Sequence, residues 1–231
     1  MAKVYWNDFW RGAGDVSPLL IAYAPIALIW GAVAAGQGFS TLEAILMSGI
    51  VYSGAAQFVA LDLMKSGTPL SLLTLAIATV ALRHVLMSAS ISRSITHFEP
   101  VRAAVQLFWL TDEAWALLER RAQHQKLTPA YFFGASFPLW PNWVLFTGIG
   151  ASVGNLLGDG ARFGLDFAFA GIFIGVLAGF WKGPRTGAIL VASAVTACLA
   201  KLWLPGAWYI MAGGAAGMAV AVATWREEEA T

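Results

Sequence analysis

The sequence predicts an all-α integral membrane protein with about seven transmembrane helices, and three observations support this class. Only 12% of the 231 residues are charged and 58% are hydrophobic, whereas about 25% of a soluble domain is charged. The mean hydropathy is +0.68. Charge-free runs at residues 16–42, 127–158 and 202–225 are each longer than the roughly 20 apolar residues that cross a bilayer. The chain is therefore expected to form one polytopic membrane domain.

The same composition disfavours several classes of function. A net charge of +1 gives the chain no electrostatic basis for binding nucleic acid. Cys198 is the single cysteine, so an internal disulfide is impossible. The sequence has neither an H-E-x-x-H metal motif nor a P-loop, so no enzyme, metal or cofactor is predicted, and ATP hydrolysis of the usual kind is excluded. A transporter with this sequence would depend on a gradient.

Three spans are expected before the polar middle of the chain, at residues 17–36, 44–64 and 68–90. Residues 1–14 are amphipathic and aromatic, which predicts that they lie on the membrane surface. Small and polar residues interrupt the second span around Ser53, so this span is predicted to be broken. It could re-enter on the side from which it came, but its 21 residues suffice to cross, which favours crossing.

Residues 92–128 form a polar linker with five Lys and Arg residues, so the linker is predicted to be cytoplasmic. Residues 101–118 within it are too short to span and predict an interfacial helix. Four further spans are expected at residues 129–156, 165–181, 184–202 and 206–225. Their number places the C-terminus in the cytoplasm. Three complete first spans place the N-terminus outside, whereas a re-entrant second segment places it inside.

The spacing of proline and glycine residues suggests an internal repeat. Pro25 and Pro141 are 116 residues apart, and so are Gly67 and Gly183. The expected boundaries are 16–91 for the first copy, 92–128 for the linker, 129–203 for the second copy and 206–225 for an extra helix. Because each copy would contain three spans, spans 1–3 and 4–6 would have inverted topology, as in transporters that hold their substrate near the midplane. Chance spacing of common residues is the alternative.

Ser53, Gly54 and Gln57 are the first candidate substrate-binding residues. A helix that breaks at Ser53 and Gly54 frees backbone N–H groups and a positive helix end, which could hold a substrate carboxylate. Gln57 supplies an amide to a span that otherwise lacks one. The alternative is a packing face in which Gln57 bonds to a neighbouring helix.

Arg83 and His84 lie well inside the apolar pattern of the third span. A cation at the bilayer centre costs at least about 2.5 kcal/mol, so such residues normally face a cavity or a partner. Arg83 is therefore expected either to line the substrate path or to snorkel to the lipid headgroups. His84 could relay protons because an imidazole ordinarily titrates near neutral pH, and a hydrogen-bonded structural role is the alternative.

Three further polar residues are candidates. Asn142 lies at a proline bend, where its amide could line a cavity. Asp112 and Asp166 are candidate proton-coupling carboxylates. Alternatively, Asp112 and Glu113 could cap the interfacial helix, pair with arginines or form a solvated acidic face, and Asp166 could favour a helix N-terminus electrostatically.

Four segments together resemble the AzlC-type permeases, the large subunit of bacterial branched-chain amino acid exporters. The segments are residues 52–58 (YSGAAQF), 82–88 (LRHVLMS), 110–117 (LTDEAWAL) and 164–168 (GLDFA). The resemblance runs from about residue 9 to residue 221. Ala81 stands where the family often has asparagine, which puts the substrate specificity in question.

The resemblance implies a secondary transporter of the bacterial inner membrane that exports branched-chain or other small hydrophobic amino acids, with a proton gradient as the energy source. It also implies a partner, a small AzlD-type membrane subunit. Two alternatives remain open from the residues alone. One is a channel-like facilitator without ion coupling, and the other is a structural or regulatory membrane subunit whose partner performs the transport.

Overall fold

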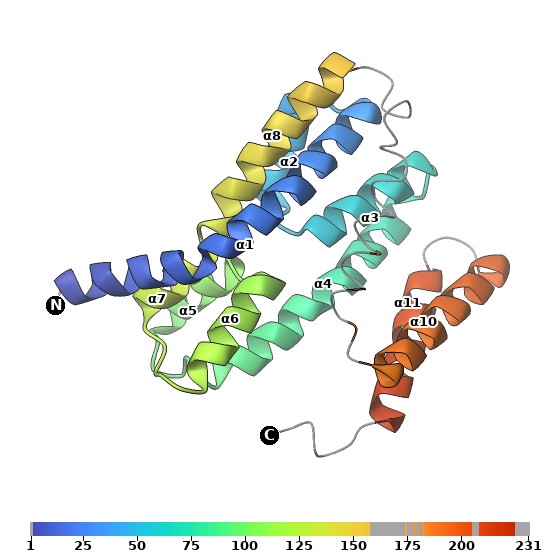
Figure 1. The fold of residues 1–231 in the computed structure, drawn as a ribbon. Helices are drawn as coiled ribbons and strands as arrows, with labels where there is room; N and C mark the ends of the chain where they lie inside the picture. Colours follow the sequence, from blue (N-terminus) through green and yellow to red (C-terminus); the bar gives the residue numbers. More distant parts are fainter. Residues whose placement is uncertain are drawn as a thin grey trace. The chain divides into compact units, whose positions relative to one another are not determined.

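The computed structural model describes residues 2–157, 174, 178, 181, 183–204 and 208–224, and this part of the chain is helical without any β-strand. The helices are α1 (Ala2–Gly36), α2 (Thr41–Ile50), α3 (Gly54–Lys65), α4 (Leu70–Ser92), α5 (Pro100–Phe108), α6 (Asp112–Ala122), α7 (Pro129–Ser136), α8 (Leu139–Leu157), α10 (Pro184–Trp203) and α11 (Trp208–Ala223) (Figure 1). The all-α prediction is confirmed for the described residues. Within the described residues, three helices are long and apolar enough to cross a membrane: α1 over Tyr5–Gly36, α4 and α10. The count of seven spans stays a prediction, because most of residues 158–182 lie outside the described part.

The chain forms two compact units. Unit 1 consists of Met1–Phe58 and Ala81–Phe169, and unit 2 consists of Val59–Val80 and Ala170–Thr231. All the candidate site residues belong to unit 1, although Asp166 lies outside the described residues.

Helix α1 continues without interruption through Pro18 and Pro25. A proline has no N–H group to donate to the carbonyl four residues earlier. At Pro18 the hydroxyl of Ser17 compensates, because it donates to the Gly14 carbonyl at 2.8 Å. The N-terminal residues, expected to lie on the membrane surface, are continuous with the first span in one helix.

Helix α1 lies against α7 and α8, and glycine residues let the backbones touch (Figure 1). A Cβ atom added to Gly31 would collide with the backbone of α8, and one added to Gly150 would collide with the backbone of Leu28. Near the other end of α1, a Cβ atom on Gly134 would collide with Phe9. The contacts thus advance in the same direction along α1 and along α7 and α8, so α1 runs parallel to these two helices.

Gly31→Ala is expected to lower the free energy of unfolding by about 1–3 kcal/mol, because the added methyl group overlaps backbone rather than a flexible side chain. Gly14→Ala on the same helix is the matched control. Within the described residues nothing lies within 4 Å of its added Cβ atom, so this change should be neutral or slightly stabilising. Thermal unfolding of the two variants in detergent compares them. Equal stability of both would argue against this close approach of α1 and α8.

Helix α2 runs antiparallel to α8. At its start, the Asn155 amide donates to the Thr41 hydroxyl at 3.3 Å. At its end, the Trp140 indole N–H donates to the Gly49 carbonyl at 3.2 Å. Helix α2 therefore runs along α8 from the C-terminal end of α8 to its N-terminal end.

The chain then reverses at residues 51–53, which we call the first tip. The backbone N–H of Ser53 bonds to the carbonyl only two residues earlier, at 2.8 Å, so helical bonding is broken there. Helix α3 starts at Gly54, and its Phe58 ring lies 6.0 Å from the ring of Trp30, in the last part of α1. Within unit 1 the chain has thus turned back toward the end from which α2 came. The predicted break is confirmed, and the re-entrant alternative describes its geometry.

Helices α5 and α6 form a second hairpin, which enters unit 1 from the opposite end. Gln106 of α5 donates to the Pro129 carbonyl at the start of α7, at 2.6 Å. Three residues later, the Trp109 ring packs against Phe137 and Trp140, with ring centroids 5.1 and 5.5 Å away. Helix α5 therefore advances alongside α7 toward α8.

The second hairpin reverses at residues 109–111, which we call the second tip. Near the end of α6, the Arg121 guanidinium lies 3.8 Å from the centroid of the Tyr131 ring, so α6 returns to the start of α7. The single interfacial helix predicted for residues 101–118 is wrong. Two short helices replace it, because a threonine N-cap starts a new helix at Asp112.

The N-terminal part of α1 lies at the same end of unit 1 as the linker. The Thr128 hydroxyl donates to the Asp8 carboxylate at 2.9 Å, and Arg121 forms an ion pair with Asp15 at 3.6 Å. Three complete spans before the linker would place these groups at opposite ends. That arrangement is wrong for unit 1, because the second segment reverses at the first tip.

The inverted form of the internal repeat is also wrong for the described residues. An inverted repeat would make the first and fourth spans antiparallel, whereas α1 and α8 run parallel and in contact. A common depth of Gly54 and Gly171 was a second expectation of the repeat, and Gly171 lies outside the described residues.

A hydrophobic core fills the linker end of unit 1. It is formed by Val16, Met87, Ile91, Ile95, Phe98, Leu110, Ala114, Leu118, Leu127, Tyr131, Phe132, Ala135 and Leu139. Helix α4 contributes Ile91, which is fully buried there, and Arg83 lies about two turns earlier on the same helix. Packing of Ile91 in this core therefore fixes how far Arg83 lies from the linker end of unit 1.

Unit 2 contains a close antiparallel pair, α10 and α11. A Cβ atom on Gly213 would lie 2.9 Å from the Ala197 Cβ, and one on Gly217 would lie 3.3 Å from the Ser193 Cβ. Small residues one turn apart are typical of helices that pack closely in membranes.

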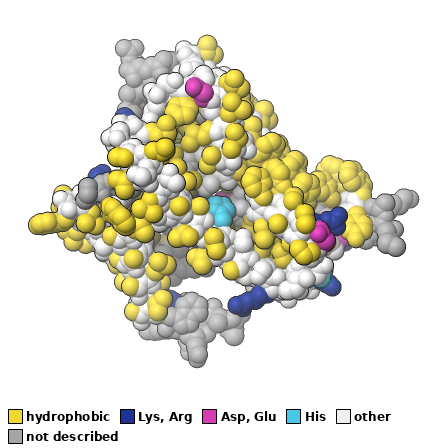
Figure 2. Space-filling model, turned by 180° about the vertical axis from the view of Figure 1, so that it is seen from behind, with side chains coloured by type: hydrophobic (Ala, Val, Ile, Leu, Met, Phe, Trp, Pro, Cys, Tyr) yellow, Lys and Arg dark blue, Asp and Glu magenta, His cyan; other side chains and the backbone are white. Residues whose placement is uncertain are grey.

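Hydrophobic side chains dominate the surface in Figure 2. Large apolar side chains are strongly exposed on both units, including Leu156 (86%) and Trp203 (83%). Exposed apolar patches of this extent mark a lipid-facing or partner-facing surface.

Candidate functional site

The two tips meet at Arg83, which reaches them from α4. Its Nη2 atom donates to the Ser53 hydroxyl of the first tip at 3.2 Å, and its Nη1 atom donates to the Asp112 carboxylate just after the second tip. The Arg83 and Asp112 side chains are 35% and 41% exposed, so the pair is only partly buried. Three candidates that lie 29 or 30 residues apart in sequence are thus brought together.

The Arg83 side chain is engaged by both hairpins. Its planar guanidinium is held between two hairpins by a fork of two hydrogen bonds. The remaining donor, Nε, is buried and has no hydrogen-bond partner among the described residues. A buried unpartnered donor is costly, and a ligand acceptor could satisfy it.

Both tips present helix N-termini to this position. The first intrahelical bond at the start of α3 is made by the Gln57 N–H to the Ser53 carbonyl at 2.9 Å, so the preceding amides have no acceptor within the helix. On the second tip, the Thr111 hydroxyl accepts from the Ala114 N–H at 3.2 Å and fixes the start of α6. Two positive helix ends and one guanidinium therefore favour an anion here.

Gly54 has a packing role in this arrangement. A Cβ atom added to it would lie 2.8 Å from Cη2 of the Trp143 indole, a rigid ring of α8. The glycine thus lets Trp143 lie directly against the start of α3. Its free amide remains a candidate ligand for a substrate carboxylate.

Gln57 is not the substrate-facing amide that the sequence suggested. Its side chain is 0% exposed, its Nε2 donates to the Ser48 hydroxyl at 2.9 Å, and the Trp143 indole N–H donates to its Oε1 at 2.9 Å. Ser48 in turn shares a 3.0 Å hydrogen bond with Thr147. The packing alternative is therefore correct, and Gln57 ties the first hairpin to α8.

Glu113 is a functional candidate that was not predicted from the sequence. Its Oε2 atom is buried and lacks a hydrogen-bond partner among the described residues, and so does the hydroxyl of Tyr52 in the first tip. Burial raises the pKa of the Glu113 carboxyl, and the neighbouring charge of Asp112 adds to the rise, whereas its own backbone N–H and the Thr111 and Tyr23 hydroxyls oppose it. The residue types around Glu113 do not indicate this burial, because two acids after a threonine are also typical of a solvated helix start.

The other candidates are less closely tied to the tips. His84 follows Arg83 on α4 and is half-buried, and its proton role stays a prediction. Asn142 has a buried Oδ1 atom without a hydrogen-bond partner in the described part of the chain, so it remains a candidate. Asp166 lies outside that part. Within the described residues, no three His, Cys, Asp or Glu side chains gather as a metal site would require.

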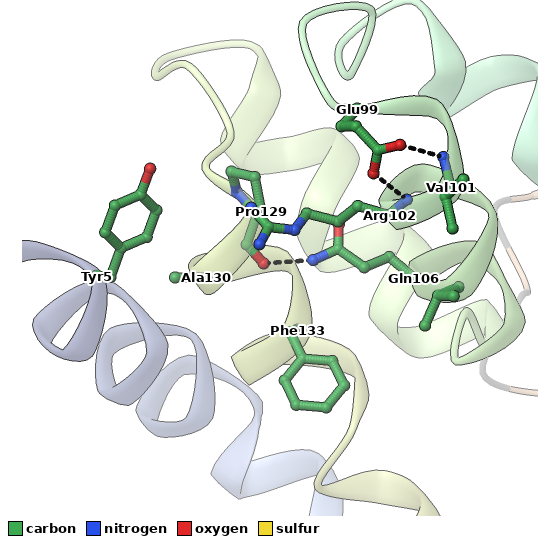
Figure 3. A pocket seen from close by; sticks show the side chains of 9 residues that line it. Tyr5, Glu99, Val101, Arg102, Gln106, Pro129, Ala130 and Phe133 are labelled. Carbon is green, nitrogen blue, oxygen red and sulfur yellow. Dashed lines mark hydrogen bonds between the residues drawn. The ribbon is translucent and has the colours of Figure 1, made fainter. Parts of the chain in front are cut away.

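A cavity of unit 1 lies elsewhere, at the linker end (Figure 3). Its volume is about 490 Å³, and Tyr5, Arg102, Gln106 and Phe133 are among its lining residues. Figure 3 shows Gln106 bonded across it to Pro129. None of the candidate site residues lines this cavity.

Comparison with known proteins assigns the chain to a family. The AzlC protein family matches residues 18–157. The "Inner membrane protein YgaZ" of Escherichia coli is 31% identical over 202 residues, which cover 85% of this chain and 82% of that protein. An "Uncharacterized membrane protein" of Archaeoglobus fulgidus is 29% identical, covering 81% and 82% of the two chains, and one of Helicobacter pylori is 28% identical, covering 73% and 75%. No solved structure matches. The chain therefore belongs to the AzlC family of membrane proteins.

Proposed function

We propose that this chain is the transporting subunit of a secondary transporter that exports branched-chain or other small hydrophobic amino acids across the bacterial inner membrane. The observation that carries the proposal is the meeting of two broken hairpins at Arg83. Interrupted helices with N-termini directed at one point are a common transporter device for holding a substrate carboxylate. The name of one relative, an inner membrane protein, supports the location.

The substrate carboxylate would bind at Arg83 between the tips. The unpartnered Nε–H group supplies one donor, and the free amides at the start of α3 supply others. Asp112 already occupies one edge of the guanidinium, so the substrate must share Arg83 with it or displace it. Asn142 and His84 remain secondary candidates for polar contacts.

A proton gradient is the proposed energy source, because the sequence has no P-loop for ATP. A small AzlD-type membrane subunit is the proposed partner, and the strongly exposed apolar side chains leave surface for one. The alternatives are a facilitator without proton coupling and a subunit that does not transport.

Flux in reconstituted vesicles tests these possibilities together. We expect leucine efflux that a pH gradient drives, at full rate only when the small subunit is present. Efflux that ignores the pH gradient would identify a facilitator. No leucine flux in any condition, with both subunits inserted, would contradict the proposal.

The linker is proposed to be cytoplasmic, and the N-terminal part of α1 with it, because these parts lie at one end of unit 1. Single cysteines at Gln123 and at Tyr5, introduced on a Cys198→Ser background, are therefore expected to resist an impermeant thiol reagent added to intact spheroplasts. Both should react once the membrane is opened. Labelling of one position but not the other in intact spheroplasts would refute the shared side.

A further inference from the structure

Glu113 and Arg83 form an unbalanced set of charges at the meeting point of the tips. Arg83 is the cation, and the adjacent Asp112 carboxylate already pairs with it. Glu113, the next residue of α6, adds a second carboxylate whose Oε2 is buried and unpartnered within the described residues. A buried carboxylate oxygen without a hydrogen-bond partner destabilises the anion, although the Thr111 and Tyr23 hydroxyls bond to the same carboxyl, so Glu113 favours a proton or a ligand cation.

Among the described residues, the groups that act on Glu113 come from α1, the two tips and α6. Tyr23 approaches from α1, Tyr52 from the first tip and Thr111 from the second tip, while Asp112 precedes it on α6. None of these four groups is a cation. Arg83 acts electrostatically on the same cluster but is held by Asp112 and Ser53.

An α-amino acid carries two charges that suit this arrangement. Its carboxylate suits Arg83 and the amides of the tips, and its ammonium group suits Glu113. We propose that the Glu113 carboxyl is shared by a proton and by the ammonium group of the substrate, which bind to it one at a time. This inference rests on the proposed function and specifies how transport would be coupled.

The exchange conserves protons. When the amino acid binds, the O–H group of Glu113 gives its proton to water, and the resulting carboxylate binds the ammonium group. When the amino acid leaves, the carboxylate takes a proton from water on the side where the substrate was released. One substrate therefore moves in exchange for one proton, which is the stoichiometry of an antiporter.

Proton release on leucine binding tests the inference directly. Calorimetry of the purified protein with its partner subunit, in two buffers of different ionisation enthalpy, counts the protons released. We expect about one proton per leucine for the wild type and about none for Glu113→Gln, whose amide cannot ionise. Glu119→Gln is the matched control on the same helix, and it should release protons like the wild type, because Glu119 is bonded to Ser90 outside the site.

A second probe separates the ammonium group from the rest of the substrate. The compound 4-methylpentanoate keeps the carboxylate and side chain of leucine but lacks the ammonium group, so we expect the wild type to bind it without releasing a proton. Proton release by this probe, or by Glu113→Gln with leucine, would overturn the inference. Leucine binding to the wild type without proton release would overturn the inference alone. No leucine binding by the wild type would overturn the proposed function, and the inference with it.

Discussion

Arg83→Lys is expected to reduce leucine transport by about 10- to 100-fold at matched membrane abundance. The substitution keeps the positive charge but removes the planar fork. In the wild type, Arg83 bonds at the same time to Ser53 of the first tip and to Asp112 beside the second tip. A lysine ammonium group is a point charge on a flexible stem, so it can keep Asp112 but cannot reproduce both bonds together with the free Nε donor.

The size of the effect follows from the bonds lost. A hydrogen bond to a charged group contributes about 1.5–3 kcal/mol, and each 1.4 kcal/mol corresponds to about a tenfold change in rate or affinity. Loss of one such bond to the substrate therefore accounts for the lower end of the range. Loss of the link between the tips as well accounts for the upper end.

The dependence on substrate concentration distinguishes the two causes. A deficit in Arg83→Lys that disappears at saturating leucine would indicate a lost carboxylate contact. A deficit that persists at saturation would indicate that the tips no longer move as a unit. Arg93→Lys is the control, because Arg93 is exposed near the end of the same helix and should tolerate lysine. Flux near the wild-type level in Arg83→Lys would remove Arg83 from the site.

Much of this site could be predicted from residue types. A charge inside an apolar helix and small residues inside a span each have an energetic cost, so both Arg83 and the break at Ser53 were visible in the sequence. The partner of Arg83 was not visible. Asp112 is 29 residues away, and only the advance of α5 to the second tip brings it to the guanidinium.

The direction of the chain could not be predicted in the same way. Residues 44–64 are long enough to cross a membrane, and a re-entrant hairpin of the same length has the same composition. The reversal depends on contacts of α2 with α8. In these contacts Asn155 bonds to Thr41, and Trp140 bonds to Gly49. Likewise, a spacing of 116 residues between prolines carries no information on whether two copies run parallel or antiparallel.

Gln57→Ala is expected to destabilise the protein by about 2–4 kcal/mol. Gln57 is fully buried and joins Ser48 of α2, through its amide nitrogen, to the Trp143 indole of α8, through its carbonyl oxygen. Truncation would remove both bonds and leave a cavity, and the Trp143 N–H would become a buried donor without an acceptor. Thermal unfolding in detergent measures the loss. Gln125→Ala, at an exposed glutamine of the linker, is the control and should unfold like the wild type.

A double-mutant cycle with Trp143→Tyr isolates the hydrogen bond from the cavity. Tyrosine lacks the indole N–H, so this single change should already break the bond to Gln57. If the bond is the main cause, adding Gln57→Ala to Trp143→Tyr should cost about 1–2 kcal/mol less than adding it to the wild type. Additive effects would mean that the cavity alone destabilises the protein. A folded Gln57→Ala variant with wild-type stability and lost transport would instead return the amide to the substrate path, because only a side chain that is free of packing can be removed without loss of stability.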